Sequence, residues 1–152
     1  MELKVGDKIP NFKAKDINGS DFDSQNLVGQ KSIVIYFYPK DNTPICTAEA
    51  CSFRDQYEDF KDLGAEVIGI SNDSIDSHQK FAKQYQLPFI LLSDTDKKIS
   101  KLFGVSSGLF GILHRRVTFV IDKNGVVQMI FDSMLAPKHI SKALETIKRL
   151  VA

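Results

Sequence analysis

Short apolar segments divide the chain and predict its strands. Residues 32–38, SIVIYFY, are almost continuously apolar and β-branched or aromatic, which is typical of a central strand covered on both faces. Residues 65–71 and 89–92 have the same character and predict two further buried strands. Residues 117–131 contain two apolar runs separated by KNG at 123–125, which predicts a β-hairpin.

Between these segments the apolar residues follow a helical period. The longest predicted helix covers about Thr43–Leu63, and Gly64 follows as the residue that ends it. Phe53, Tyr57 and Phe60 recur at helical spacing and predict its buried face. The other predicted helices are Ser74–Tyr85, Asp96–Phe103 and a C-terminal helix with an apolar stripe of Ile140, Leu144, Ile147 and Val151.

The order of these elements predicts the fold class. Residues Phe12–Phe22, with Asn18-Gly19 at the turn, predict an N-terminal β-hairpin before the first central strand. Strands and helices then alternate, which favours a central sheet with helices on both faces, and the late hairpin makes the sheet mixed. We therefore expect an α/β, thioredoxin-like fold with a mixed central sheet, flanking helices and an N-terminal hairpin extension. One domain would cover residues 1–152.

Composition narrows the class of protein further. Apolar residues make up 43% and charged residues 26% of the 152 residues, which is ordinary for a soluble globular domain. A net charge of +1, without a basic stripe, predicts neither a nucleic-acid nor a membrane partner. The longest strongly apolar run, Ile33–Tyr38, is too short to span a bilayer, and no secretory segment is visible at the N-terminus. The default expectation is a cytoplasmic protein.

The two cysteines of the chain are Cys46 and Cys51, and the first lies in a reactive position. Thr43 is a good N-cap residue for the long helix, and Pro44 then falls at its first position. Cys46 becomes the third helical residue, among unpaired N–H groups at the positive end of the helix dipole, where a thiolate is favoured. The hydroxyl of Thr43 is expected to cap one of these N–H groups. The alternative is that Cys46 is a small buried hydrophobic residue.

Cys51 lies too far along the same helix for a static disulfide. Five residues of ideal helix place two Cα atoms about 8.5–9 Å apart, beyond the roughly 7 Å that a disulfide allows. The thiols of Cys46 and Cys51 could therefore join only if the first helical turns unwind. The alternative for Cys51 is a cysteine that packs into the core of an amphipathic helix.

Other candidate residues give weaker signals. A zinc site is poorly supported, because His78, His114 and His139 are far from the cysteines and from one another in sequence, and each is expected to be a surface or loop residue. Arg116 directly precedes the strand that starts at residue 117, so its guanidinium could project into a site beside the sheet. Alternatively, Arg115 and Arg116 are two solvated charges.

Two motifs resemble the peroxiredoxin family. The stretch PKDNTPICTAEAC resembles the family's Pro-x-x-x-Thr-x-x-Cys motif at Pro39, Thr43 and Cys46. The second cysteine five residues later resembles the peroxiredoxin Q subfamily, also called bacterioferritin comigratory proteins. The stretch RVTFVIDKNGVVQ resembles the strand that carries the family's active-site arginine, which falls on Arg116. The similarity runs from VGDKIPNF to the last helix.

The resemblance implies a thioredoxin-dependent peroxidase for hydrogen peroxide and organic hydroperoxides. Cys46 would be the peroxidatic cysteine, oxidised to a sulfenic acid, and Cys51 the resolving cysteine, which forms an intramolecular disulfide with it. Thioredoxin or a similar dithiol would restore both thiols. No metal, haem, flavin or other cofactor is required. Because the resolving cysteine lies in the same chain, a monomer is expected.

The resemblance also implies a peroxide pocket. Thr43 and Arg116 would position and polarise the peroxide, while Pro39 and Pro44 shape and shield the site. Ile45 departs from the pattern, because the subfamily usually has glycine there, so its side chain could narrow the pocket or stiffen the first turn.

Other functions use the same residues. A thioredoxin-like disulfide reductase would need a C-x-x-C motif, which the chain lacks. A peroxide sensor that passes its oxidation to a partner protein would use the same two cysteines, so this alternative stays open. In a purely structural or binding protein, neither thiol would react with peroxide.

Overall fold

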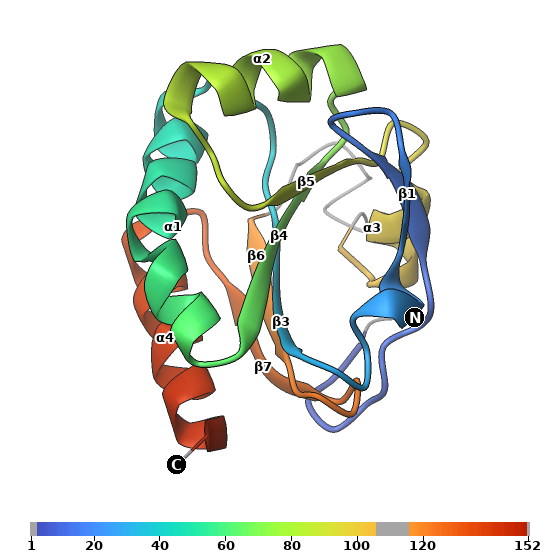
Figure 1. Cartoon of the computed structure of the whole chain (residues 1–152), viewed down its shortest axis with the longest axis vertical. Helices are drawn as coiled ribbons and strands as arrows, with labels where there is room; N and C mark the ends of the chain where they lie inside the picture. The colour runs from blue at the N-terminus through green and yellow to red at the C-terminus, as the bar shows by residue number, and fades with distance from the viewer. Residues whose placement is uncertain (1–2, 106–115, 152) are drawn as a thin grey trace.

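The computed structural model describes residues 3–105 and 116–151, and the predicted elements appear in order along them (Figure 1). The strands are β1 (Lys13–Asp16), β2 (Asp21–Asp23), β3 (Ser32–Phe37), β4 (Ala65–Ser71), β5 (Ile90–Ser93), β6 (Val117–Ile121) and β7 (Val127–Asp132). The helices are α1 (Pro44–Asp62), α2 (Ile75–Tyr85), α3 (Lys98–Leu102), α4 (Pro137–Val151) and the short 3-10 turn η1 (Ser24–Asn26). In this described part of the chain, no helix has the length and hydropathy of a membrane span.

The strands form one mixed sheet in the order β2-β1-β5-β4-β3-β6-β7. The central strands β3, β4 and β5 are parallel to one another, whereas β6 runs antiparallel to β3 and β7 antiparallel to β6. The N-terminal hairpin joins the same sheet, because β1 pairs antiparallel with β5. The expected thioredoxin-like α/β fold with a mixed sheet and an N-terminal hairpin is therefore confirmed.

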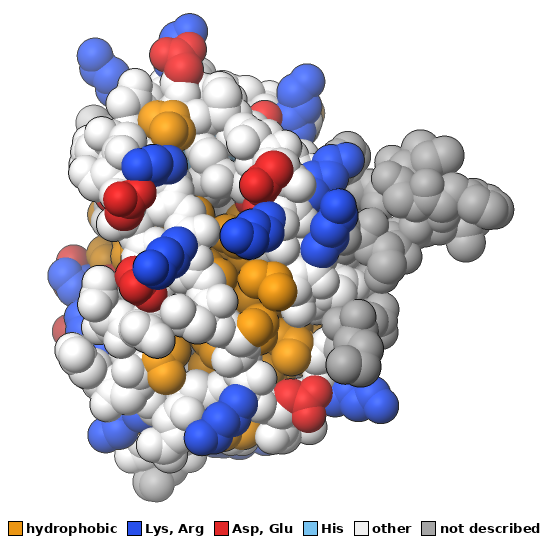
Figure 2. All heavy atoms as spheres, turned by 90° about the vertical axis from the view of Figure 1, so that its right-hand side faces the viewer, with side chains coloured by type: hydrophobic (Ala, Val, Ile, Leu, Met, Phe, Trp, Pro, Cys, Tyr) orange, Lys and Arg blue, Asp and Glu red, His pale blue; other side chains and the backbone are white. Residues whose placement is uncertain are grey.

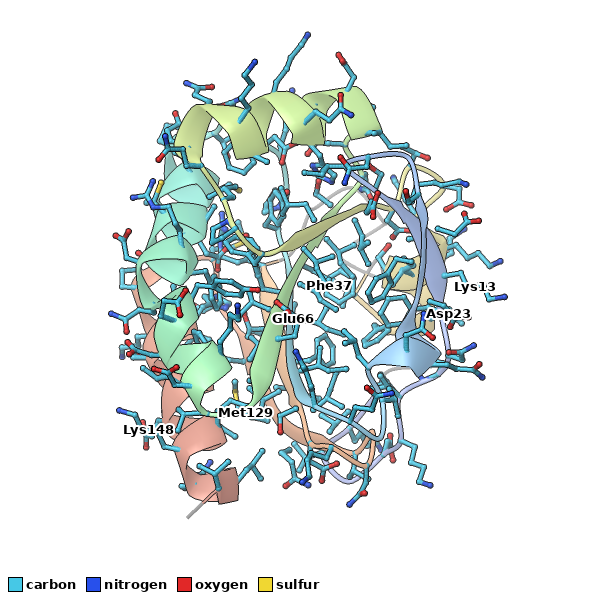
Figure 3. All side chains as sticks on the ribbon, in the orientation of Figure 1. Lys13, Asp23, Phe37, Glu66, Met129 and Lys148 are labelled. Atoms are coloured by element: carbon cyan, nitrogen blue, oxygen red, sulfur yellow. The ribbon has the colours of Figure 1, made fainter. Side chains whose placement is uncertain are left out.

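Both faces of the sheet are covered, as the composition of residues 32–38 predicts. Figure 1 shows α1 and α4 side by side on one face, with α3 on the other. The side chains of β3 alternate between two apolar cores: Val34 and Tyr36 pack on the α1 side, and Ile35 and Phe37 on the α3 side. Figure 3 shows Phe37 pointing into the α3 side of the sheet. This double cover fixes the end of β3, from which the chain leads into α1.

The outer surface mixes charges of both signs. On the face that Figure 2 shows, Lys and Arg side chains are interspersed with Asp and Glu around a small group of apolar side chains. Lys13 and Lys15 on β1 lie 3.8 Å and 2.5 Å from the carboxylates of Asp23 and Asp21 on β2. Exposed pairs of this kind contribute little to stability, but they keep this edge of the sheet strongly polar.

Two expectations about side chains are wrong. His78 and His139 are completely buried, not surface residues, because polar groups from other elements satisfy both rings; His114 lies outside the described residues. Val151 is 55% exposed, so the apolar stripe of α4 stops before it. The helix instead buries Ala143 together with Ile140 and Ile147.

Candidate active site

The start of α1 has the predicted residues but a different hydrogen bond. Thr43 is the N-cap, with extended backbone, and Pro44 occupies the first helical position. The hydroxyl of Thr43 donates to the carbonyl of Lys40, at 3.0 Å, and does not cap a helix N–H group, so that expectation is wrong. Among the described residues, no side chain caps this helix start. The first-turn N–H groups therefore stay available for an anion beside the helix.

Cys46 lies in this first turn and is buried, with 1% of its surface exposed. Cys51, five residues further along α1, is half-buried. Both cysteines are free thiols. The expectation that an intact helix keeps the two cysteines unbridged agrees with this structure.

Arg116, which lies 70 residues after Cys46 in the sequence, contacts the sulfur of Cys46 in the fold. It directly precedes β6, and its guanidinium is 2% exposed. Nη2 donates to the sulfur of Cys46 at 3.2 Å, and Nε donates to the carbonyl of Met134 at 3.2 Å. Burial lowers the pKa of Arg116, but Glu49 and Cys46 outweigh this effect and raise it above its ordinary value. The alternative that Arg116 is a solvated charge is therefore wrong. Arg115 lies outside the described residues.

Glu49 is a site residue that sequence reasoning missed. It lies one turn after Cys46 on the same face of α1, is fully buried, and accepts a hydrogen bond from Nη1 of Arg116 at 2.5 Å. Its second oxygen has no hydrogen-bond partner among the described residues and lies 3.8 Å from Nδ1 of His139. Burial raises the pKa of Glu49 to about 7, although the Arg116 guanidinium acts in the opposite direction. A charged residue inside the apolar stripe of Cys46, Ala50 and Phe53 is the signal that could have identified it.

His139 completes the polar surroundings of Glu49. Its Nε2 lies 2.7 Å from the carbonyl of Ser133, so Nε2 carries a hydrogen, and its Nδ1 lies 2.7 Å from the hydroxyl of Thr118. Burial lowers the pKa of His139 below its ordinary value. In the neutral ring, Nδ1 then accepts a hydrogen bond from the Thr118 hydroxyl. The site thus joins α1, β6 and the start of α4.

The remaining predicted residues lie between the end of β3 and the first turn of α1. Pro39 is half-buried in the segment that follows β3, Thr43 is half-buried, and Pro44 is exposed. The side chain of Ile45 is 48% exposed, so much of it faces solvent at the rim of the site. The structure brings Cys46 and Arg116 into direct contact and places Cys51 outside that contact.

This arrangement can stabilise a thiolate and the charge that develops when it attacks an oxygen. The helix N-terminus and one guanidinium both face the sulfur of Cys46, and both attract negative charge. Because the guanidinium is held on its other nitrogens by Glu49 and Met134, its direction is fixed before a substrate arrives.

Comparisons with known proteins agree with this chemistry. Residues 5–130 match the model of the AhpC/TSA family. Chloroplastic peroxiredoxin Q of Sedum lineare is 51% identical over 150 residues, which are 98% of this chain and 80% of that protein. The crystal structure of peroxidoxin BcpB from Mycobacterium tuberculosis superimposes with a TM-score of 0.91 at 36% identity, covering 98% of this chain and 99% of that one. The bacterioferritin comigratory protein of Xanthomonas campestris, studied for alkyl peroxide reduction, has a TM-score of 0.85 at 28% identity, with 93% and 92% covered.

These comparisons correct one expectation and confirm another. Eight curated relatives, 47–51% identical, are all named chloroplastic, so the expectation of a cytoplasmic protein is wrong and the relatives point to a plastid. The resemblance to peroxiredoxin Q is confirmed over almost the whole chain. The chain belongs to the AhpC/TSA family, in its peroxiredoxin Q group, and is a thioredoxin-dependent thiol peroxidase.

Proposed function

We propose that Cys46 is the peroxidatic cysteine of this antioxidant enzyme and Cys51 its resolving cysteine. The observation that carries the first assignment is the contact between Arg116 Nη2 and Cys46 Sγ, 3.2 Å apart at a helix N-terminus. A thiolate is the nucleophile in cysteine chemistry, and this is the environment that favours it. Among the described residues, Cys51 receives no hydrogen bond from a guanidinium, although Arg54 interacts with it electrostatically at longer range.

The first step is an in-line displacement. The Cys46 thiolate attacks one peroxide oxygen, the S–O bond forms as the O–O bond breaks, and the leaving oxygen takes up a proton as water or an alcohol. Arg116 and the free N–H groups of the first helical turn stabilise the charge on the leaving oxygen. The hydroxyl of Thr43 orients the peroxide, and Pro39 and Pro44 limit access of solvent. The product is a Cys46 sulfenic acid.

The second step needs a change of shape. The Cys51 thiol condenses with the sulfenic acid, so an S–S bond forms and water leaves. Because the two Cα atoms of an intact helix are about 8.5–9 Å apart, about two turns at the start of α1 must unwind. Phe53, which is fully buried against the sheet, marks the end of the segment that opens.

The third step regenerates the enzyme. A thioredoxin-type dithiol attacks the exposed disulfide, leaves both cysteines reduced and becomes a disulfide itself. Organic hydroperoxides are proposed as substrates beside hydrogen peroxide, supported by the alkyl peroxide reduction studied in the Xanthomonas campestris relative. A single domain that acts as a monomer is sufficient, because both cysteines lie on one helix.

Cysteine substitutions test the two roles. Cys46→Ser should abolish peroxide consumption, because a serine hydroxyl at this position has no accessible alkoxide. Cys51→Ser should keep the first, stoichiometric step and lose turnover with thioredoxin. Peroxide consumption and thiol counting distinguish the two variants, and the reverse pattern would exchange the assignments.

Substitution of the arginine tests the transition-state contact. Arg116→Ala should slow the first step by roughly 100- to 1000-fold, the usual cost of one preorganised donor. Arg115→Ala is the matched control and should have a far smaller effect. Rapid-mixing measurements of Cys46 oxidation give both rates, and equal, small effects would show that the arginine assignment is wrong.

Glu49 should make folding stability depend on pH. Because burial raises its pKa from 4.5 to about 7, the unfolded chain loses this proton first as the pH rises. The contribution of Glu49 to stability is therefore full below pH 4.5 and declines until about pH 7. As the pH rises from 4.5 to about 7, the free energy of unfolding of Glu49→Gln should increase relative to that of the wild type by on the order of 1–3 kcal/mol.

Urea unfolding at several pH values measures this difference. The exposed Glu58, on the same helix, supplies the control Glu58→Gln, whose stability should run parallel to that of the wild type. A constant offset between wild type and Glu49→Gln at every pH would show that Glu49 does not titrate in the window.

Hydrogen exchange tests the unwinding step. On oxidation to the Cys46–Cys51 disulfide, amides between about Ala48 and Phe53 should lose protection, while those of β3 should keep it. Cys51→Ser treated with peroxide is the control, because it cannot form the disulfide and its helix should stay protected. Unchanged protection in wild type, with the disulfide confirmed by mass, would refute the unwinding model.

A further inference from the structure

A second buried polar cluster lies beside the start of α1 and has no part in the chemistry described above. Asp41, in the segment between β3 and α1, is 5% exposed, and His78 on α2 is completely buried. Nδ1 of His78 lies 2.7 Å from Oδ2 of Asp41. The hydroxyl of Tyr38 donates to Oδ1 at 2.6 Å, and that of Ser77 donates to Oδ2 at 2.9 Å.

The partners define the role of each group in the Asp41–His78 pair. Nε2 of His78 lies 3.0 Å from the carbonyl of Leu92, which can only accept, so Nε2 is a donor. Asp41 accepts hydrogen bonds from the hydroxyl groups of Tyr38 and Ser77, and its Oδ2 also contacts Nδ1 of His78. The ring of His78 thus links α2 and β5 to Asp41. A buried acceptor with this many donors is held in one place.

The backbone of Asp41 is fixed too. Its N–H group donates to the carboxylate of Asp73 at 2.8 Å, and that carboxylate accepts the hydroxyl of Ser71 at 2.6 Å. Asp41, Asp73 and His78 lie close enough together to hold a metal ion, but the hydrogen bonds among them and their neighbours already use these groups. The cluster therefore acts as an anchor for the chain at residue 41.

Only one residue separates this anchor from the N-cap of α1. Asn42 has a positive φ of 61°, a sharp turn that directs the chain from the cluster into the helix. Lys40, on the other side of Asp41, supplies the carbonyl that accepts the Thr43 hydroxyl. The position of Asp41 therefore sets the position of Thr43, and through it the first turn that carries Cys46.

We propose that Asp41 and His78 are positioning residues for the peroxide reaction: their buried contact holds Thr43 and the first turn of α1 in the geometry that lets Cys46 attack peroxide. The proposal rests on the proposed role of Cys46. It also gives the unwinding segment two fixed ends, because Phe53 is buried at the other end. Cys46 and Cys51 would then remain close while residues 42–52 change shape.

The experiment compares two reactions of the same thiol. In Asp41→Asn, an N–H donor replaces an acceptor oxygen of Asp41. In His78→Gln, one side-chain amide must replace both ring nitrogens, which contact Asp41 and Leu92. Rapid-quench mass spectrometry follows Cys46 in the reduced chain with one equivalent of hydrogen peroxide, and separately with iodoacetamide. Because misplacement by about 1 Å can cost about 100-fold, we expect the peroxide rate constant to fall at least about tenfold in each variant. The iodoacetamide rate constant should stay within about twofold or rise, since alkylation needs no oriented peroxide.

Glu66→Gln is the matched control. Glu66 on β4 (Figure 3) is a buried carboxylate that accepts a hydrogen bond from a tyrosine hydroxyl, as Asp41 does. Its partner Tyr57, however, lies in the C-terminal part of α1. This variant should leave both rate constants unchanged, even if it lowers stability. If either test variant does not fold, Ser77→Ala removes one donor to Asp41 and should still lower the peroxide rate constant more than the iodoacetamide one.

Each outcome decides between distinct conclusions. Unchanged peroxide rates in the test variants, parallel losses with both reagents, or an equal loss in Glu66→Gln would overturn the positioning role. If wild-type Cys46 did not react with peroxide at all, the proposed function itself would fail.

Discussion

The buried guanidinium of Arg116 is the interaction on which the site depends. It lies 70 residues after Cys46 and 67 after Glu49 in sequence, yet it contacts both. A buried cation is costly unless its donors are satisfied, so the fold has to bring α1, β6 and the carbonyl of Met134 together around it. The same requirement fixes the direction of the positive charge toward the sulfur. Stability and reactivity are thus coupled, because removing the acceptors that orient Arg116 also leaves its charge unpaired.

Much of the fold could be predicted because its signals are local. The strand 65–71 has its predicted bounds, and the long helix begins after Thr43 because N-cap and first-position preferences act over a few residues. Gly64 has a positive φ of 78°, as expected for a residue that ends a helix. Cys46 and Arg116 could be assigned to one site only through the resemblance, since no local pattern relates residues on different elements.

The errors at polar residues come from specific hydrogen-bond partners that the pattern of apolar positions does not reveal, near in sequence for Thr43 and distant for His78 and Glu49. The hydroxyl of Thr43 donates to the carbonyl of Lys40, which the turn before the helix places beside it. His78 is buried because Asp41 and Leu92 supply partners for its two ring nitrogens, and neither residue is close in sequence. Glu49 faces the core because its partner Arg116 comes from another element, 67 residues later in the sequence. The periodicity of apolar residues predicts burial least well for polar residues that have specific partners in the core.

The short strand β2 has a consequence for the enzyme's behaviour in solution. It ends the sheet with three residues, of which Asp21 and Asp23 are acidic and lie near lysines of β1. An edge this short and this charged gives another chain little backbone with which to pair. An enzyme whose proposed cycle repeatedly opens a helix exposes apolar surface at each turnover, and molecules in that state could otherwise associate through their sheets. The short, charged edge strand β2 opposes such aggregation at this side of the sheet.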